Sequence, residues 1–199
     1  MGIDVRAARP HDADAIADAH SEAWRVAYQH LVSAAFLESD SVAAARRQSW
    51  RRLLIDDVRP EGLDPDHRLY VGVLDERVVG FGHVGAVHSE DPAGAPAVAD
   101  REELGELYGF YVHPIAWGTG VADRLIEQCH ATLQERCGVA VLWVLSDNPR
   151  ARRFYERHGW SCDTHSGTVT ALWEGPIAPG VPRLETPIPE TRYHKRFDI

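Results

Sequence analysis

The sequence predicts a mixed α/β fold, and three stretches carry this prediction. Residues 104–112 are rich in aromatic and β-branched residues, as in a strand, and a glycine turn joins them to an amphipathic helix. Residues 68–74 and 78–84 are two further strand-like runs around a short polar turn. Residues 139–145 are almost continuously apolar, as in a strand buried on both faces. Strands and helices therefore share one chain.

Composition and charge limit the possible function classes. Of the 199 residues, 44% are hydrophobic and 26% are charged, which is typical of a soluble domain with a substantial core. We expect a single domain over residues 1–199. The formal net charge of −9 argues against broad binding to nucleic-acid phosphates. Three cysteines without zinc spacing indicate a cytoplasmic protein with reduced thiols, and no apolar stretch predicts a signal peptide or a membrane segment.

The first part of the chain predicts a strand, three helices and a hairpin. The expected strand and helices cover residues 3–7, 10–27, 31–39 and 41 to about 56. Ser41 is expected to be the N-cap of the third helix. In the hairpin, strands 68–74 and 78–84 flank a turn at residues 75–77. A surface loop rich in Ala, Pro, Gly and Asp follows at 89–101.

Two strand–helix units follow in the second part. Strand 104–112 should end before Pro114, which cannot donate to a ladder. The next helix places apolar residues at helical spacing, namely Val121, Ala122, Leu125, Ile126, Cys129 and Leu133. After strand 139–145, Asn148 is an expected N-cap with Pro149 at the first helical position.

The C-terminal part predicts a helix stop, a loop and a last strand. Gly159 is a favourable end for the helix that begins at Pro149. Residues 175–190 carry most of the prolines and predict a long loop. Residues 191–197 alternate as in a final strand.

Two glycines, Gly118 and Gly120, lie where a strand gives way to a helix. Glycine allows a tight turn and a close approach by a ligand. The unpaired N–H groups and the dipole of the helix start favour an anion, such as a phosphate or pyrophosphate. For a lone Gly-x-Gly, a tight turn that binds nothing is the preferred explanation.

Three motifs occur in a fixed order along the second half of the chain. They are YVHP at 111–114, WGTGVA at 117–122 and NPRARRFYERHGW at 148–160. Together they resemble the GNAT superfamily of acyl-CoA-dependent N-acyltransferases. The pairing of the glycine turn with the later Asn-x-x-Ala-x-x-Phe-Tyr pattern is much more specific than either motif alone. The resemblance extends over nearly the whole chain.

The resemblance implies a fold and an activity. The fold is a twisted, mostly antiparallel sheet of about six to seven strands, flanked by about four helices. Its fourth and fifth strands, here 104–112 and 139–145, splay apart to admit pantetheine. The implied activity is the transfer of an acetyl group from acetyl-CoA to a primary amine, by direct attack in a ternary complex and without a metal.

Site residues also follow from the resemblance. Tyr155 would stand near the sulfur and protonate the departing thiolate. The residues that would contact the co-substrate acetyl-CoA are Phe110, Tyr111, Val112, Trp117, Gly118, Thr119, Gly120, Val121, Ala122 and Asn148. Tyr155 has the alternative role of a core residue of its helix, and Asn148 that of an N-cap alone.

Two positions depart from the family pattern. The family usually carries Gln or Arg three residues before the first glycine, and Arg directly before it. Here these positions hold Ile115 and Trp117, which bring no charge to the phosphates. Either backbone amides suffice, or a basic residue substitutes, with Arg150, Arg152 and Arg153 as candidates. A solvated helix face is the alternative explanation of these arginines.

Acetyl transfer to an amine requires a base, because an ammonium has no lone pair. Glu106 matches the strand position that supplies the base in some family members. Period two along the strand predicts that Glu106, Tyr108, Phe110 and Val112 share a face. At roughly 3.3 Å per residue, Glu106 lies about 13 Å from Phe110, so a water chain is expected. Alternatively Glu106 lies in solvent, and Glu102 or Glu103 supplies the base.

Other polar and aromatic residues have two explanations. The histidines His83, His88, His113 and His165 lack the spacing of metal ligands, so no metal site is expected. Trp24, Tyr28 and Trp173 line an acceptor pocket or pack in the core.

Several functions and partners stay open at this point. The alternatives to acetyl transfer are a non-catalytic acyl-CoA-binding sensor and an acyltransferase that uses a longer acyl group. The acceptor is a small-molecule or peptide amine of unspecified identity. We expect no nucleic-acid or membrane partner, and residues 175–190 could serve a homodimer interface.

Overall fold

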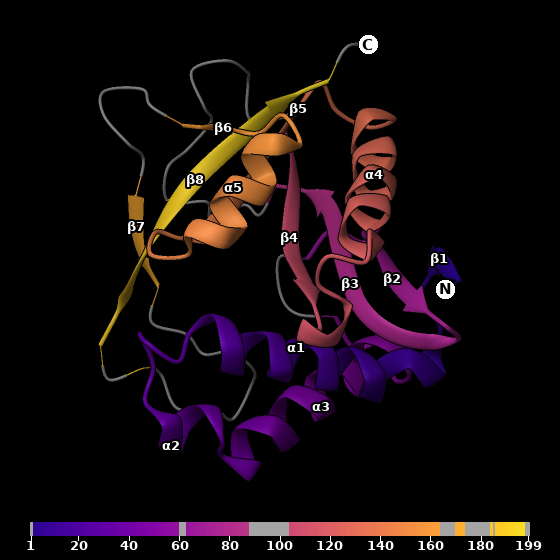
Figure 1. The fold of residues 1–199 in the computed structure, drawn as a ribbon. Coiled ribbons are helices and arrows are strands. Elements are labelled where there is room, and N and C mark those ends of the chain that lie inside the picture. Colours follow the sequence, from indigo (N-terminus) through magenta and orange to yellow (C-terminus); the bar gives the residue numbers. More distant parts are fainter. Residues whose placement is uncertain are drawn as a thin grey trace.

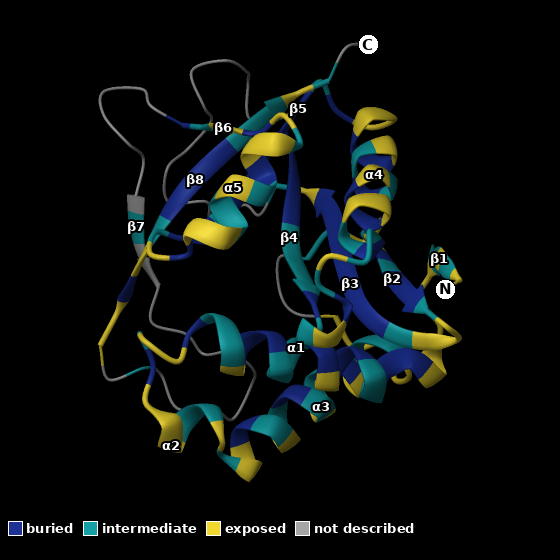
Figure 2. Cartoon of the chain, viewed as in Figure 1, coloured by how far each residue is buried: buried dark blue, intermediate teal, exposed yellow. Residues whose placement is uncertain are grey.

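The structure, a computed structural model, describes residues 2–59, 63–87, 104–163, 170–173, 184 and 186–197. Within these residues the chain forms a single eight-stranded sheet with helices on both faces (Figure 1). The central strands are mostly buried and the outer faces of the helices are exposed (Figure 2). None of the helices in these ranges combines the length and the apolar character needed to cross a membrane.

The first half of the fold matches the predicted order of elements. Its elements are β1 (Ile3–Ala7), a 3₁₀ turn (Pro10–Asp12), α1 (Ala13–Ala27), α2 (Ala34–Leu37), α3 (Asp40–Leu54), β2 (Arg68–Leu74) and β3 (Arg77–Ala86). Ser39, and not Ser41, precedes α3, because the helix already begins at Asp40. The hairpin turn is shorter than predicted. It consists of Asp75 and Glu76, both with positive φ, and Arg77 already belongs to β3.

The second half contains two short strands that the sequence did not predict. Its elements are β4 (Leu104–Val112), a 3₁₀ turn (Pro114–Ala116), α4 (Val121–Gln134), β5 (Val139–Leu145), α5 (Pro149–Arg157), β6 (Ser161–Cys162), β7 (Thr170–Trp173) and β8 (Ile188–Arg196). The last strand begins at Ile188, so the predicted loop 175–190 is wrong over its final residues, which pair with β5 and β7. The predicted loop 89–101 lies outside the described residues.

The strand order is β1-β2-β3-β4-β5-β8-β6, and β7 pairs with β8. Every pair is antiparallel except β4 with β5. The mostly antiparallel α/β fold is therefore confirmed, with β6 and β7 bringing the strand number above the expected six to seven.

β4 and β5 separate along most of their length. Their parallel ladder covers Leu104 to Glu106 on β4 and Val139 to Val141 on β5. Beyond that point β4 continues to Val112 and β5 to Leu145, but the two strands no longer pair. The predicted splay is confirmed, and it leaves an opening in the middle of the sheet.

Helices cover both faces of the sheet. α1 packs on one face, where Ile16 and Ala17 meet Val71 and Phe81. α4 and α5 pack on the other face, where Ile126 and Tyr155 join the same core cluster. We call these the α1 face and the α4 face of the sheet.

Candidate active site

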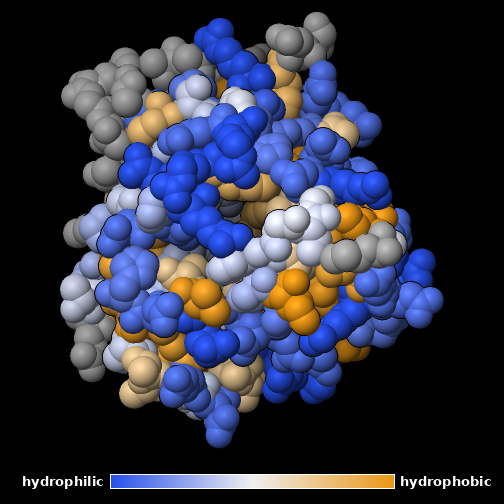
Figure 3. All heavy atoms as spheres, in the orientation of Figure 1, coloured by the Kyte–Doolittle hydropathy of each residue, from blue (hydrophilic) through white to orange (hydrophobic). Residues whose placement is uncertain are grey.

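A cavity of about 880 Å³ occupies the opening between β4 and β5. On the α1 face its walls include Trp24 and Tyr28, and on the α4 face they include Gly118 and Phe154. The cavity therefore passes through the sheet and offers two chemically separate halves. In Figure 3, hydrophilic side chains gather over α5 beside a hollow in the surface.

The glycine turn forms one wall of the cavity on the α4 face. Gly118 and Gly120 have φ values of 77° and 92°, which only glycine adopts without strain. A Cβ placed on Gly118 would meet nothing within 4 Å, so the turn is open to a ligand there. The first bond within α4 runs from the Arg124 amide to the Gly120 carbonyl, over 3.2 Å. The preceding N–H groups, including that of Ala122, lie at the open end of the helix, which is an anion-binding geometry.

Two residues of the turn have side chains that serve the fold. The Thr119 hydroxyl donates to the Ala116 carbonyl at 2.7 Å. The Val121 side chain is fully buried against Leu125. The Thr119 amide also donates to the Ala116 carbonyl, over 3.3 Å. Of these two residues, only Val121 would therefore contact a phosphate, through its backbone N–H group.

Trp117 positions an arginine at the cavity. The Arg150 guanidinium lies 3.5 Å from the centroid of the Trp117 ring, and both side chains line the cavity. The Trp117 indole donates to the Val112 carbonyl at 2.8 Å, which fixes the ring. The position that usually carries arginine in the family thus holds a platform for an arginine from α5.

The other two candidate arginines differ from each other. Arg153 also lines the cavity. Arg152 instead donates to the Tyr193 hydroxyl at 2.9 Å and to the Ser146 carbonyl at 3.2 Å. Of the three arginines proposed from the sequence, Arg150 and Arg153 line the cavity, whereas Arg152 makes structural hydrogen bonds.

The edge of β4 that faces the opening offers backbone groups. The His113 amide donates to the Val79 carbonyl at 2.7 Å, so the backbone groups of His113 point toward β3. The direction of the backbone N–H and C=O groups alternates from one residue of a strand to the next. The backbone groups of Tyr111 therefore also point toward β3, whereas those of Phe110 and Val112 point into the opening. The Val112 carbonyl is already bonded to Trp117.

A β-bulge changes the face on which Glu106 lies. The register of β3 against β4 moves from His83–Gly109 to Val84–Leu107, so one extra residue stands in β4. Leu107 and Phe110 consequently both pack in the core of the α4 face. The prediction that Glu106 and Tyr108 share a face with Phe110 and Val112 is therefore wrong. Both point to the α1 face, where the Tyr108 ring lies 5.0 Å from that of His83.

A second carboxylate lines the same half of the cavity. Glu190, on β8, pairs in register with Leu145 of β5, which packs against Trp24 and Tyr28. Glu190 and Glu106 both line the cavity. Burial, and in smaller part the charge of Glu106, raises the pKa of Glu190 to about 7. Glu190 is not apparent from the sequence, because Pro189 obscures the start of β8. Glu102 and Glu103 lie outside the described residues.

Tyr155 and Asn148 line the cavity from α5 and its cap. Tyr155 is 7% exposed, and burial raises the pKa of its hydroxyl, which therefore stays protonated at neutral pH. The Asn148 side chain accepts from the Ala151 amide at 3.0 Å, which confirms the N-cap. Its amide nitrogen also donates to the Tyr28 hydroxyl at 3.5 Å, so the cap connects α5 to α1.

Aromatic side chains form most of the α1-face half. Trp24 and Tyr28 are buried in the core and also line the cavity. Their role in an acceptor pocket stays a prediction. The other aromatic and imidazole rings in this half are His20, Trp50, Phe81, His83, Tyr108, Tyr111 and Trp143. The side chain of Trp173 lies outside the described residues.

The histidines have separate partners. His83 lines the cavity and is hydrogen-bonded to His67, whereas His113 accepts from the Ile115 amide at 3.1 Å. His88 and His165 lie outside the described residues. Within the described part of the chain, no group of three His, Cys, Asp or Glu side chains is arranged to hold a metal ion.

Known proteins resemble this chain in sequence. The model of the acetyltransferase (GNAT) family matches residues 15–160. An uncharacterized N-acetyltransferase of Archaeoglobus fulgidus is 37% identical over 60 residues, which are 30% of this chain and 41% of that protein. The similarity to this relative thus covers less than half of its length.

Solved structures resemble the chain in fold. PaiA N-acetyltransferase of Thermoplasma acidophilum, in complex with coenzyme A, superimposes with a TM-score of 0.66 at 16% identity, over 99% of this chain and 100% of that one. YncA of Salmonella typhimurium, with its cofactor acetyl-CoA, gives a TM-score of 0.59 at 18% identity, over 100% and 96%. At these identities the likeness establishes a shared fold.

Proposed function

The chain belongs to the GNAT family of acetyltransferases, and from this premise we propose that it transfers an acetyl group from acetyl-CoA to a primary amine by direct attack in a ternary complex. The observation that supports this most is the cavity that passes between β4 and β5. The glycine turn lies in one half, and two carboxylates lie in the other. Donor and acceptor can then meet in the opening.

Binding of the donor would use the α4-face half. The amides at the start of α4 would hold the diphosphate, and Arg150 and Arg153 would add positive charge. Pantetheine would extend along β4, where the backbone groups of Phe110 and the amide of Val112 face the opening. One of these amides would donate to the thioester carbonyl as negative charge develops on its oxygen.

The chemistry would use one proton acceptor and one proton donor. Glu106, or a water that it holds, takes a proton from the bound ammonium, and the freed lone pair attacks the thioester carbonyl carbon. As the C–S bond breaks, the Tyr155 hydroxyl gives its proton to the departing sulfur, and the second proton that the attacking nitrogen loses returns to Tyr155 through water. The sequence singled out Glu106 and Tyr155, and we retain both roles.

Glu190 would act together with Glu106. A group with a pKa of about 7 is well matched to proton transfer at neutral pH. Because Glu190 lies in the same half of the cavity as Glu106, it would also bind the substrate ammonium. Aromatic walls and acidic groups favour a cationic amine as acceptor, either a small molecule or a peptide. A homodimer stays a prediction.

A paired experiment tests the proposal. Calorimetry would measure binding of acetyl-CoA, and a thiol-release assay would follow turnover on a panel containing an alkylamine, a diamine, an arylalkylamine, an amino acid and a peptide. We expect binding together with turnover on at least one amine. Binding without turnover on any amine would favour the acyl-CoA sensor, and stronger competition by a longer acyl-CoA would favour a different donor.

A further inference from the structure

Two hydrogen-bonded histidines connect the α1-face half of the cavity with the outside of the protein. His83 Nε2 and His67 Nδ1 are 2.9 Å apart, and the ring centroids are 4.8 Å apart. His83 lies on β3, is 8% exposed and lines the cavity. His67 directly precedes β2 and is half-buried. From this pair we infer that His83 and His67 form a relay that carries the proton released by the acceptor amine to bulk water.

The inference rests on the proposed acetyl transfer to an amine. Each turnover releases one proton from an ammonium into a buried chamber. While the donor fills the opening and the acceptor fills the aromatic half, exchange with bulk water through those routes is restricted. The proton could then leave through the wall of the cavity that contains His83 and His67.

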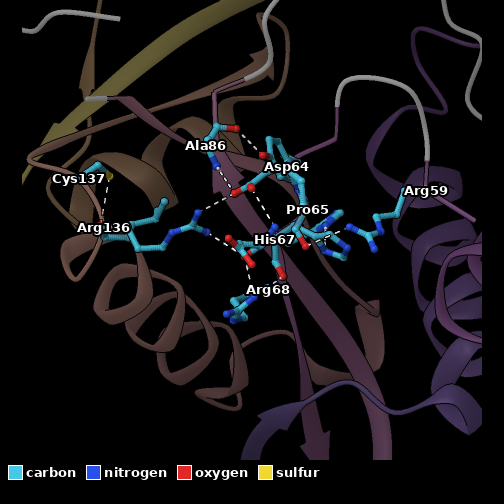
Figure 4. Close-up of polar contacts among 12 residues, drawn as sticks. Arg59, Asp64, Pro65, His67, Arg68, Ala86, Arg136 and Cys137 are labelled. Atoms are coloured by element: carbon cyan, nitrogen blue, oxygen red, sulfur yellow. Dashed lines mark hydrogen bonds and ion pairs between the residues drawn. The ribbon is translucent and has the colours of Figure 1, made fainter. Parts of the chain in front are cut away.

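The wall around His67 is held in place by a polar network (Figure 4). The Asp64 carboxylate accepts from the Ala86 amide at 2.9 Å and from Arg136 Nη2 at 2.8 Å. The His67 amide donates to the Asp64 carbonyl at 3.1 Å. Arg136 also donates to the Asp66 carbonyl at 2.9 Å. The segment that carries His67 is thus anchored to β3 and to the end of α4, which keeps the two rings in register.

Imidazole chemistry permits passage through both rings. A proton that reaches His83 Nδ1 from the base, through cavity water, allows Nε2 of the same ring to release its proton to His67 Nδ1. His67 Nε2 then releases its proton to bulk water. One proton enters and one leaves, and no covalent bond between heavy atoms changes. When the hydrogen bond between the rings opens, each ring loses a proton to water at one nitrogen and gains one at the other, which restores the starting tautomers with no net transfer.

The surroundings of His67 favour its neutral form, so that a proton bound by His67 is released readily. Burial lowers the pKa of His67, Arg59 and Arg68 lower it further, and Asp64 and Asp57 act in the opposite direction. The neutral ring therefore predominates at pH 7. It can accept a proton from His83 and lose it again to water.

Rescue by free imidazole separates a relay from a structural hydrogen bond. In His67→Ala, we expect kcat with the best amine of the panel to fall by about 10²-fold, at the lower end of the range for positioned proton transfer, with the KM for acetyl-CoA unchanged. Added imidazole should restore kcat in a concentration-dependent manner, because the half-buried site is accessible. His83→Gln should show the same loss in kcat.

His130→Gln is the matched control, because His130 accepts from Trp160 at 2.9 Å and does not line the cavity. Its kcat should equal that of the wild type and should not respond to imidazole. The relay is wrong if His67→Ala keeps the wild-type kcat, or if it loses activity that imidazole does not restore. Should His83→Gln not fold, the His67 variant decides alone. A wild-type protein that binds acetyl-CoA but acetylates no amine would instead overturn the proposed function.

Discussion

The two halves of the cavity differ in charge and in origin. The α4-face half contains the amides of the glycine turn and the side chains of Arg150 and Arg153, whereas the α1-face half contains Glu106 and Glu190 among aromatic rings. The first half comes from two short motifs, and the second comes from side chains of α1, α3 and several strands. Asp123 of α4 also lines the cavity. Under the proposed function, the arginines favour the anionic donor on one face of the sheet and the carboxylates favour the cationic acceptor on the other.

We expect the largest effect when both carboxylates are removed from the α1-face half of the cavity. In the double variant Glu106→Gln/Glu190→Gln, we expect kcat to fall by about 10²- to 10⁴-fold, because no carboxylate is left to take the ammonium proton. Acetyl-CoA affinity by calorimetry should stay unchanged, since the α4-face half is intact. Glu127→Gln, an exposed residue of α4, is the control. Turnover near that of the wild type would rule out both residues as the base.

We expect the second largest effect when the proton donor, Tyr155, is removed from the opening between the two halves. In Tyr155→Phe, we expect kcat to fall by about 10²-fold, because the thiolate loses its proton donor. Tyr70→Phe is the matched control, since the Tyr70 hydroxyl bonds Thr132 at 2.8 Å and does not line the cavity. If Tyr155→Phe folds normally and keeps full turnover, the assignment of Tyr155 as the acid is incorrect.

We expect a smaller effect when one positive charge is removed from the α4-face half of the cavity. Arg150→Ala should reduce the affinity for acetyl-CoA by about fivefold to tenfold, because one charge near the phosphates is lost. Salt should weaken binding to the wild type more than to the variant. The acceptor KM should not change. Arg47→Ala on α3, whose partner is Asp18 at 2.9 Å, is the control. Equal affinities of the Arg150 and Arg47 variants would contradict the role of the Trp117–Arg150 stack.

The smallest expected effect concerns stability and does not depend on a substrate. The pKa of Glu190 in the folded protein, about 7, lies above the value of 4.5 for an ordinary glutamate. The folded state therefore binds more protons between these values, and stability falls as pH rises through this range. Glu190→Gln removes the buried charge, so at pH 8 it should raise Tm by about 2–4 °C for each kcal/mol recovered. At pH 5 the difference should shrink, and an equal difference at both pH values would refute the shifted pKa.

Local patterns predicted the core strands and the motifs of the α4-face half. Strands 104–112 and 139–145 were predicted at the bounds that the structure has, because apolar and β-branched runs are strong local signals. The Asn148 cap was also predicted, since capping depends on neighbouring residues. The face of Glu106 was predicted wrongly, because a bulge near Tyr108 depends on the pairing with β3.

The sequence by itself determined the order of the longer strands and helices, the glycine turn at the start of α4 and the family, because each depends on residues that are close along the chain. Only the tertiary structure decided that Arg150 stacks on Trp117, that Glu190 joins Glu106 and that His83 meets His67. These pairs are distant in sequence, or lie on different elements. Only strand register and helix packing bring them together.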